Sequence, residues 1–367
     1  MKPARITAAL AERQAAGRNG TRDGLSWLAE TGLTDRDTLA RTMVGDGASL
    51  FGLLVAVGRG DLAAGRLFEG HVDALGLVQR LGTEDQRVRV AALVAEGRLL
   101  GIWGADDPDA PARVEATGGG YALSGRKTYA SGAHGLGGAL VAAKDPRGAT
   151  RLVLLGRDDL AGRFDPDWWD PIGMAETCSD AVDLGGLRVP EGAVIGAPGA
   201  YEGHPAFGAG AIRFVAVQLG GLLGVWDAMR EHLSRTDRTG DPHQAMRLAE
   251  AVAEAEAAYA LTRAAFARLA PVISWSGAGR ADESALRAAD AARLGVRRAS
   301  ERTTELAIRS VGCGGLMHRH PLSRRVTDLM VYLCQPAPDA AAGRLGKAAG
   351  TGSYVPLFDA DGDLDAD

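Results

Sequence analysis

The sequence predicts an α+β protein in three parts. We expect a helical N-terminal domain over residues 1–99, an antiparallel β-domain over 100–198 and a C-terminal four-helix bundle over 199–350. The prediction rests on the apolar spacing, which is helical at both ends of the chain and alternates over short runs in the middle. The 367 residues, 46% of them hydrophobic, are enough to bury several layers of core.

The first part has the pattern of short helices interrupted by glycines. Within residues 58–82, Phe68, Val72 and Val78 share one broad face, which is the spacing of a helix packed on a core. The charged residues of this segment are expected mostly on a solvated face. The lone His71 is expected to be a packed or capping residue rather than a catalyst.

The second part contains short runs of alternating and β-branched residues, separated by glycine and aspartate turns. We interpret these runs as the strands of an antiparallel β-domain. They read LLGIWG, YALSGRKTYAS, GALVAAK, TRLVLLG and AVDLGGLRVP. The tetrapeptide DPRG at 145–148 is expected to form one of the turns between strands.

The third part is helical after Gly203. Apolar residues at helical spacing predict helices over 211–233, 244–269, 281–311, 323–333 and 339–349. The chain ends in FDADGDLDAD, which lacks the glutamate that completes a calcium-binding loop. Residues 351–367 are therefore predicted to be a disordered acidic tail.

Composition restricts the classes of function. A net charge of -5 argues against nucleic acid as the main partner, although it leaves room for a local basic pocket. No apolar run approaches the roughly 18 residues of a membrane span, and the N-terminus lacks the apolar region of a signal peptide. A cytoplasmic protein that binds no membrane is expected. The three cysteines are too far apart for a metal or redox pair, and Cys313 is the one placed to matter.

The most informative motif lies in residues 307–339. A glycine-rich turn, Gly312-Cys313-Gly314-Gly315, follows a long predicted helix, and Pro321, a basic pair and Asp328 come after it. This order resembles the C-terminal signature of the acyl-CoA dehydrogenase family. Three segments of the β-domain resemble the same family in the same order: 103–108, 125–132 and 173–190. The resemblance covers roughly residues 50–350 and implies the helix, sheet and bundle architecture of that family.

The resemblance implies an FAD cofactor whose isoalloxazine ring lies against the β-domain. By this correspondence, Trp103, Ala105 and Asp106 would line one edge of the ring. Tyr129 would pack near it, and Ser131 would offer its hydroxyl near the redox nitrogen. An aromatic residue and a hydroxyl two positions later lie on one face of a strand, which suits a flat ring with polar edges. An ordinary strand pair is the alternative interpretation.

The resemblance also implies a cofactor site shared between subunits. Arg238, Arg309 and the Gly312-Cys313-Gly314 turn would reach the adenosine and pyrophosphate of FAD bound by a neighbouring subunit. Solvated helix ends are the alternative for both arginines. A homodimer or homotetramer is expected, because the bundle presents more alanine-lined apolar surface than one chain can cover.

The sequence departs from the family at the catalytic base. Pro336 stands where most of the family carries the glutamate that removes a proton from the acyl chain. A second position that the family uses, just before an arginine on the first bundle helix, corresponds to Ile212. Asp339 is a weak candidate for a relocated base, and Glu202 is a weaker one.

Two further departures concern ligands. Asp106 replaces a threonine that donates toward the flavin pyrimidine edge in the family. Its charge would oppose reduced flavin unless the carboxyl is protonated or turned outward. Ala112 replaces the serine that meets the CoA pyrophosphate, and Arg309 replaces a glutamine that reaches a neighbour's adenosine.

Two functions remain open. The first is an FAD-dependent oxidoreductase acting on CH-CH groups of an acyl thioester or another small molecule, with a relocated base or with oxygen chemistry. The second is a non-catalytic subunit of a heteromeric acyl-CoA dehydrogenase. Ordinary acyl-CoA dehydrogenation is expected to be weak or absent, because removal of an α-proton needs a base near the carbon.

Overall fold

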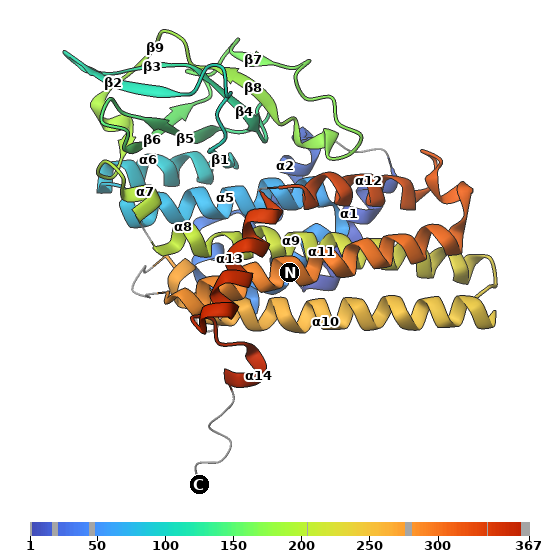
Figure 1. Ribbon diagram of the computed structural model, residues 1–367. Coiled ribbons are helices and arrows are strands. Elements are labelled where there is room, and N and C mark those ends of the chain that lie inside the picture. The colour runs from blue at the N-terminus through green and yellow to red at the C-terminus, as the bar shows by residue number, and fades with distance from the viewer. Residues whose placement is uncertain are drawn as a thin grey trace.

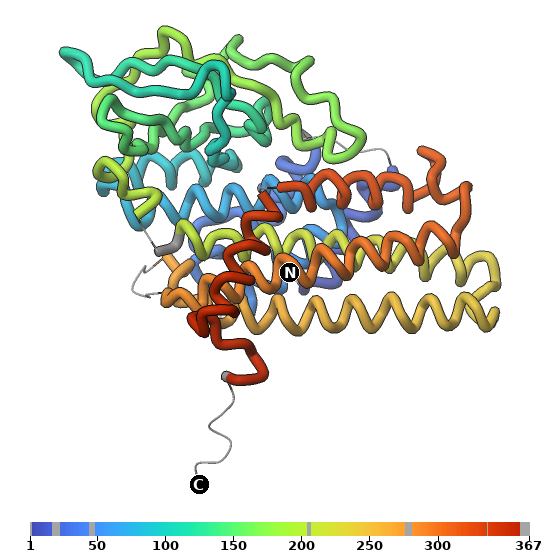
Figure 2. The backbone as a smooth tube through the Cα atoms, in the orientation of Figure 1, coloured from blue at the N-terminus to red at the C-terminus, as the bar shows by residue number. Residues whose placement is uncertain are grey.

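The computed structural model describes residues 2–16, 21–43, 48–203, 205–275, 281–335 and 337–360. Figure 1 shows N-terminal helices, a β-domain above them and a long helical bundle, and Figure 2 traces the same path of the backbone. The predicted fold class, that of the acyl-CoA dehydrogenases, is confirmed. Pro336 and the part of the predicted tail at 361–367 lie outside the described residues.

The N-terminal domain surrounds one buried helix. Its helices are α1 (Pro3–Ala15), α2 (Thr21–Glu30), α3 (Arg36–Thr42), α4 (Ala48–Gly60), α5 (Leu62–Leu81) and α6 (Glu84–Ala95). The Asp61 carboxylate caps α5 by accepting from the amide of Ala64 at 3.0 Å. Phe68, Val72 and Val78 of α5 are buried, as their spacing predicts.

Two charged residues of α5 contradict the predicted solvated face. Glu69 is 7% exposed, and its partner Arg66 has a side chain that is 16% exposed. The reason is tertiary, because β1 and α12 pack against α5 in addition to its N-terminal neighbours. A helix enclosed on several sides buries its polar residues as well, and such residues must then pair.

The β-domain consists of two sheets. Its strands are β1 (Leu100–Trp103), β2 (Arg113–Thr117), β3 (Gly120–Ser124), β4 (Arg126–Ala130), β5 (Gly138–Lys144), β6 (Thr150–Gly156), β7 (Phe164–Asp165), β8 (Asp180–Asp183), β9 (Leu187–Val189) and β10 (Val194–Ile195). The larger sheet has the order β10-β6-β5-β2-β3-β9, with β1 also paired to β5, and the smaller has the order β4-β8-β7.

Pairing in the sheets is antiparallel, as predicted, except for two of the three neighbours of β5. Strand β1 pairs with β5 in parallel, and β2 meets β5 in parallel at one position. A parallel pair needs a long crossover, which the intervening β2, β3 and β4 provide. The alternation of side chains along a strand does not encode this direction, so the sequence prediction missed it.

The C-terminal part contains the predicted bundle. Its helices are α7 (Ala200–Gly203), α8 (Pro205–Ala209), α9 (Ala211–Arg235), α10 (Pro242–Ile273), α11 (Glu283–Val311), α12 (Pro321–Leu333), α13 (Pro338–Thr351) and α14 (Leu357–Ala360). Within the described residues, the helical run Phe207–Arg235 is long and apolar enough to cross a membrane by composition. In the fold, 72% of that apolar window is buried, which is typical of a core helix.

One loop joins the β-domain to the bundle. A Cβ on Gly173 would lie 2.1 Å from the carbonyl oxygen of Thr327, so only glycine permits this approach. The next amide, that of Met174, donates to the Asp328 carboxylate at 2.6 Å. Burial raises the pKa of Asp328 above its usual range, while this amide and Arg324 oppose the rise. The loop before β8 is thereby fixed on α12.

His71 joins α5 to β1 and is a packed residue, as predicted. It is fully buried, its Nδ1 accepts from the amide of Leu100 at 3.0 Å, and its Nε2 lies 3.0 Å from the carbonyl oxygen of Thr34. Since a carbonyl accepts, Nε2 must be the protonated nitrogen. The ring is therefore neutral, and burial lowers its pKa from 6.5 to about 4.

Candidate active site

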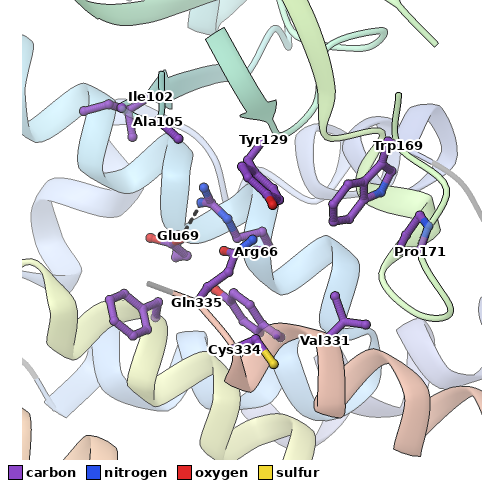
Figure 3. A pocket seen from close by; sticks show the side chains of 13 residues that line it. Arg66, Glu69, Ile102, Ala105, Tyr129, Trp169, Pro171, Val331, Cys334 and Gln335 are labelled. Atoms are coloured by element: carbon purple, nitrogen blue, oxygen red, sulfur yellow. Dashed lines mark hydrogen bonds and ion pairs between the residues drawn. The ribbon is translucent and has the colours of Figure 1, made fainter. Parts of the chain in front are cut away.

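A cavity of about 650 Å³ lies between the β-domain and the bundle. The β-domain contributes Ile102, Gly104, Ala105, Tyr129, Trp169 and Pro171 to its wall. The helices contribute Arg66 and Glu69 from α5, Phe214 from α9, and Val331, Tyr332, Cys334 and Gln335 from the end of α12 and just beyond it. Figure 3 shows Tyr129 and Trp169 on one side and the Arg66–Glu69 pair on another.

The aromatic wall depends on an irregular strand. Strand β4 pairs with β8, and the register shifts between Lys127 and Ala130. Within this bulge Tyr129 has a positive φ of 53°, a conformation that an L-residue adopts when its surroundings impose it. The residue is 49% exposed, and its ring meets Trp168 and Trp169 edge-on at centroid distances of 4.9 and 5.9 Å. The bulge thus leaves Tyr129 exposed toward the cavity.

The polar wall is an ion pair on α5. Arg66 Nη1 donates to Glu69 Oε1 at 2.5 Å. Burial raises the pKa of Glu69, and the charge of Arg66 opposes the rise. Beside this pair, Arg66 Nε is buried with no hydrogen-bond partner among the described residues, and the Tyr332 hydroxyl is buried close to the Glu69 carboxylate. Burial also raises the pKa of Tyr332 well above its usual range, so the hydroxyl stays protonated. A donor without an acceptor, Arg66 Nε, is thus buried within this polar wall.

The Ser131 hydroxyl belongs to a short chain of hydroxyl groups. Thr177 Oγ1 donates to the carbonyl oxygen of Met174 at 2.7 Å, and it lies 2.7 Å from Ser179 Oγ. Ser179 Oγ in turn lies 2.9 Å from Ser131 Oγ. Because a carbonyl only accepts, Ser179 must donate to Thr177, and Ser131 to Ser179. Ser131 is buried, and its hydroxyl proton is already used within the β-domain.

The other residues predicted along the ring edge have different positions. Ala105 lines the cavity. Trp103 is 1% exposed and lies behind the wall, where its Nε1 donates to the carbonyl oxygen of Ser131 at 3.1 Å. Asp106 accepts from Lys127 Nζ at 2.7 Å, and the lysine also donates to the carbonyl oxygens of Gly104 and Ala142. The carboxylate charge that we expected to oppose a reduced flavin is balanced by this ammonium.

The candidate bases from the sequence do not lie in this cavity. Pro336 is outside the described residues, although Gln335 just before it lines the wall. Asp339 has a fully exposed side chain in the first turn of α13, 3.8 Å from Arg297, and is not among the lining residues. Ile212 is buried, and Glu202 is an exposed partner of Lys144 at 3.0 Å.

The residues predicted to reach a neighbour's cofactor gather at one end of the bundle. Arg238 donates to the carbonyl oxygen of Ser310 at 3.2 Å, at the C-terminal end of α11. Arg309 pairs with Glu305 at 3.3 Å, and its side chain is 55% exposed. Gly312 has a φ of 79°, Cys313 is exposed, and nothing lies within 4 Å of a Cβ built on Gly312 or Gly314. The described chain leaves the turn open.

Sequence reasoning missed the polar residues of the cavity, Arg66, Glu69 and Tyr332. A signal was present, because Arg66 and Glu69 are an oppositely charged pair at i and i+3 in a helix that is otherwise rich in apolar residues and glycine. Tyr332 belongs to an apolar run whose burial we expected, but the sequence does not indicate that this residue would line the cavity.

No protein-family model and no curated protein matches this sequence. Several solved structures share its fold. Among them is the complex of TdsC from Paenibacillus sp. A11-2 with FMN and indole, with a TM-score of 0.83 and 17% identity, covering 96% of this chain and 97% of TdsC. A second structure of TdsC names TdsC as a dibenzothiophene monooxygenase.

Two other proteins have the same fold. Methanesulfinate monooxygenase MsuC from Pseudomonas fluorescens aligns with a TM-score of 0.80 and 18% identity, over 97% of this chain and 98% of MsuC. KijD3, in complex with FMN and a dTDP-linked amino-keto sugar, aligns with a TM-score of 0.69 and 22% identity, over 96% and 95% of the two chains. At such identities the similarity establishes the fold, while function must be argued from the site.

Proposed function

We propose that this protein is a flavin-dependent monooxygenase that binds FMN in the cavity beside Tyr129. The observation that carries the proposal is the composition of that cavity. It has an aromatic wall for a flat ring, but Glu69 is its one carboxylate among the described residues, and an arginine binds it. A dehydrogenase needs a free base beside the substrate carbon, whereas transfer of oxygen does not.

The residues of the cavity fit a flavin ring. Its volume of about 650 Å³ lies within the range of sites for cofactors and small ligands. Tyr129 and Trp169 supply aromatic surface, and Tyr332 and Arg66 are lining residues with hydrogen-bond donors, which suit the polar edge of a ring that carries carbonyl oxygens. These four residues would hold the cofactor.

The cofactor and the chain would divide the chemistry. Reduced flavin supplies two electrons to molecular oxygen, so that one oxygen atom enters the substrate and the other leaves as water. The described residues would orient the substrate. Phe214, Ile102 and Val331 provide apolar contact, and the Arg66–Glu69 pair keeps a fixed charge arrangement on α5.

The choice of FMN over the predicted FAD has two supports. TdsC and KijD3 are described in complex with FMN. In addition, Arg238 and Arg309, which the FAD prediction assigns to an adenosine and pyrophosphate, already contact groups of their own chain at the end of α11. FMN has no adenosine, so these contacts need not be broken.

A second candidate is a dehydrogenase in which Glu69 is the relocated base. Its favourable observation is that burial raises the pKa of Glu69, which strengthens a carboxylate as a base. Against it stands the 2.5 Å bond from Arg66, which stabilises the ionised carboxylate.

One experiment separates these functions. The purified protein is titrated with FMN, the bound flavin is reduced without oxygen, and indole is added with ¹⁸O-labelled oxygen. We expect FMN uptake and one labelled oxygen atom in the product, and Glu69→Gln should retain this incorporation. Bleaching of the oxidised flavin by an acyl-CoA without oxygen, abolished by Glu69→Gln, would instead show the dehydrogenase. Flavin uptake solely after co-expression with a catalytic homologue would show the partner subunit.

A further inference from the structure

A second chamber of about 640 Å³ adjoins the candidate active site. The two chambers have five lining residues in common: Arg66, Glu69, Ile102, Gly104 and Phe214. The second chamber continues between α5, α8, the start of α9, α11 and α13. The two chambers are therefore neighbours, and a ligand at the aromatic wall lies close to the second one.

The lining of the second chamber has four arginines and three carboxylates. Arg66 pairs with Glu69, and Asp73 pairs with Arg213, which is not part of the lining, so the excess positive charge lies among the remaining groups. Arg287, Arg293 and Arg344 line one side together with a single carboxylate, Asp290. Asp290 is 4% exposed and is bound by Arg344 at 2.6 and 3.1 Å and by Arg287 at 3.3 Å. Three guanidinium groups thus surround one negative charge.

Arg293 is the cation in this group that lacks a carboxylate contact. Its Nη2 donates to the carbonyl oxygen of Gln335 at 2.6 Å, and its guanidinium lies 5.3 Å from the centre of the Phe214 ring. No carboxylate of the described residues forms an ion pair with it, and the residue is 6% exposed. The charge of Asp290, three residues earlier on α11, acts on Arg293, but Asp290 already pairs with Arg287 and Arg344, so the site would gain from a second anion.

Arg293 stands at the junction of the two chambers. Gln335, whose carbonyl it holds, lines the first chamber, and Phe214, against which it stacks, lines both. The adjacent surface is apolar at Ile102 and Phe214. An anionic group here would leave the apolar body of the same molecule directed toward Tyr129.

We propose that the substrate is a small apolar molecule with one carboxylate, which Arg293 binds at the junction while the body extends to the aromatic wall. That the bound molecule is a substrate rests on the proposed function, whereas binding of the carboxylate by Arg293 does not. A single carboxylate matches a single buried guanidinium that has no carboxylate partner, and an arginine fork binds that group with two parallel hydrogen bonds. Arg287 supplies the second positive charge.

The test compares two probes that differ by the carboxylate, indole and indole-3-carboxylate. Their dissociation constants for the purified protein are measured by isothermal titration calorimetry, which needs no turnover. We expect the wild type to bind indole-3-carboxylate at least tenfold more tightly than indole. Arg293→Gln should remove this preference, and Arg293→Lys should keep part of it, because the positive charge remains.

Arg297→Gln is the matched control. Arg297 lies one turn further along α11, and it is more exposed and pairs with Glu301 at 2.9 Å, so its loss should leave the tenfold preference intact. Thermal melts followed by circular dichroism report whether each variant is folded. If Arg293→Gln does not fold, the preference of the wild type for indole-3-carboxylate and its reduction in Arg293→Lys still test the anion site.

The outcomes also separate this inference from the proposed function. Indole-3-carboxylate binding no tighter than indole to the wild type, including no measurable binding of either, overturns the anion site. A preference that persists in Arg293→Gln overturns the role of Arg293. If the carboxylate is preferred but no labelled oxygen is transferred, the anion site stands and the monooxygenase proposal fails.

Discussion

His71 should make the stability of the joint between α5 and β1 depend on pH. Both elements line the candidate site, and the neutral ring connects them through Leu100. Burial lowers the pKa of His71 from 6.5 to about 4, so the unfolded chain takes up the proton first as pH falls. The stabilisation is complete above the unfolded pKa and is lost progressively down to the folded one. By linkage, the loss between neutral pH and pH 4.5 is about 2.5 kcal/mol.

The measurement is a difference between two proteins, because many carboxyl groups also titrate in this range. Urea unfolding of the wild type and of His71→Gln is followed at pH 7.5 and 4.5. A glutamine can donate to Thr34 and accept from Leu100 but does not titrate. We expect the advantage of the wild type over the variant to shrink by about 2.5 kcal/mol at the lower pH. His318→Gln, at an exposed position, is the control.

An equal advantage at both values of pH would refute the reasoning. It would mean that the ring is either protonated in the folded state or already hydrated through a local opening. A change of the same size in His318→Gln would point to a general effect of acid on the fold and would equally remove the support for a buried neutral His71.

Two shorter predictions follow from other contacts. Lys127→Met should destabilise the fold by about 3 kcal/mol in urea unfolding, because it leaves Asp106 and two carbonyl oxygens without their ammonium donor, whose side chain is fully buried; an unchanged midpoint would contradict this. We also propose that α10 contributes to an oligomer interface through its exposed apolar residues, among them Met246 at 72% and Val252 at 39% exposure. Met246→Lys with Val252→Lys should convert the oligomer to monomer in light scattering, and a wild type that is already monomeric would refute it.

The order of helices and strands could be predicted because the spacing of apolar residues within each segment indicates a helix or a strand. Helix α5 repeats apolar residues at helical spacing, and β5 and β6 are short runs between turns. The parallel direction of β1 against β5 could not be predicted, because it depends on which strands meet after a crossover.

The site was harder to predict, because burial of a polar residue is decided by the neighbours of its helix. Arg66 and Glu69 have the sequence pattern of a solvated pair, and the β-domain that covers them lies far along the chain. The motifs carried over from the family located Tyr129 and Ala105 at the cavity wall. They did not indicate that Trp103 would lie behind that wall. Its neighbour on β1, Ile102, lines the cavity instead, and adjacent strand residues face opposite sides of a sheet.

The cofactor itself gives the last prediction, because FMN and FAD differ by the part that Arg309 was predicted to hold. Arg309 lies in the last turn of α11, with an exposed side chain paired to Glu305. If a neighbour's adenosine or pyrophosphate bound here, Arg309→Ala would remove a charge-assisted hydrogen bond and weaken FAD roughly tenfold, while FMN binding would not change. Under our proposal neither dissociation constant changes, as in the control Arg298→Ala, an exposed position on the same helix. Fluorescence titration of both flavins against the three proteins measures this, and a loss of FAD binding confined to Arg309→Ala would restore the FAD assignment.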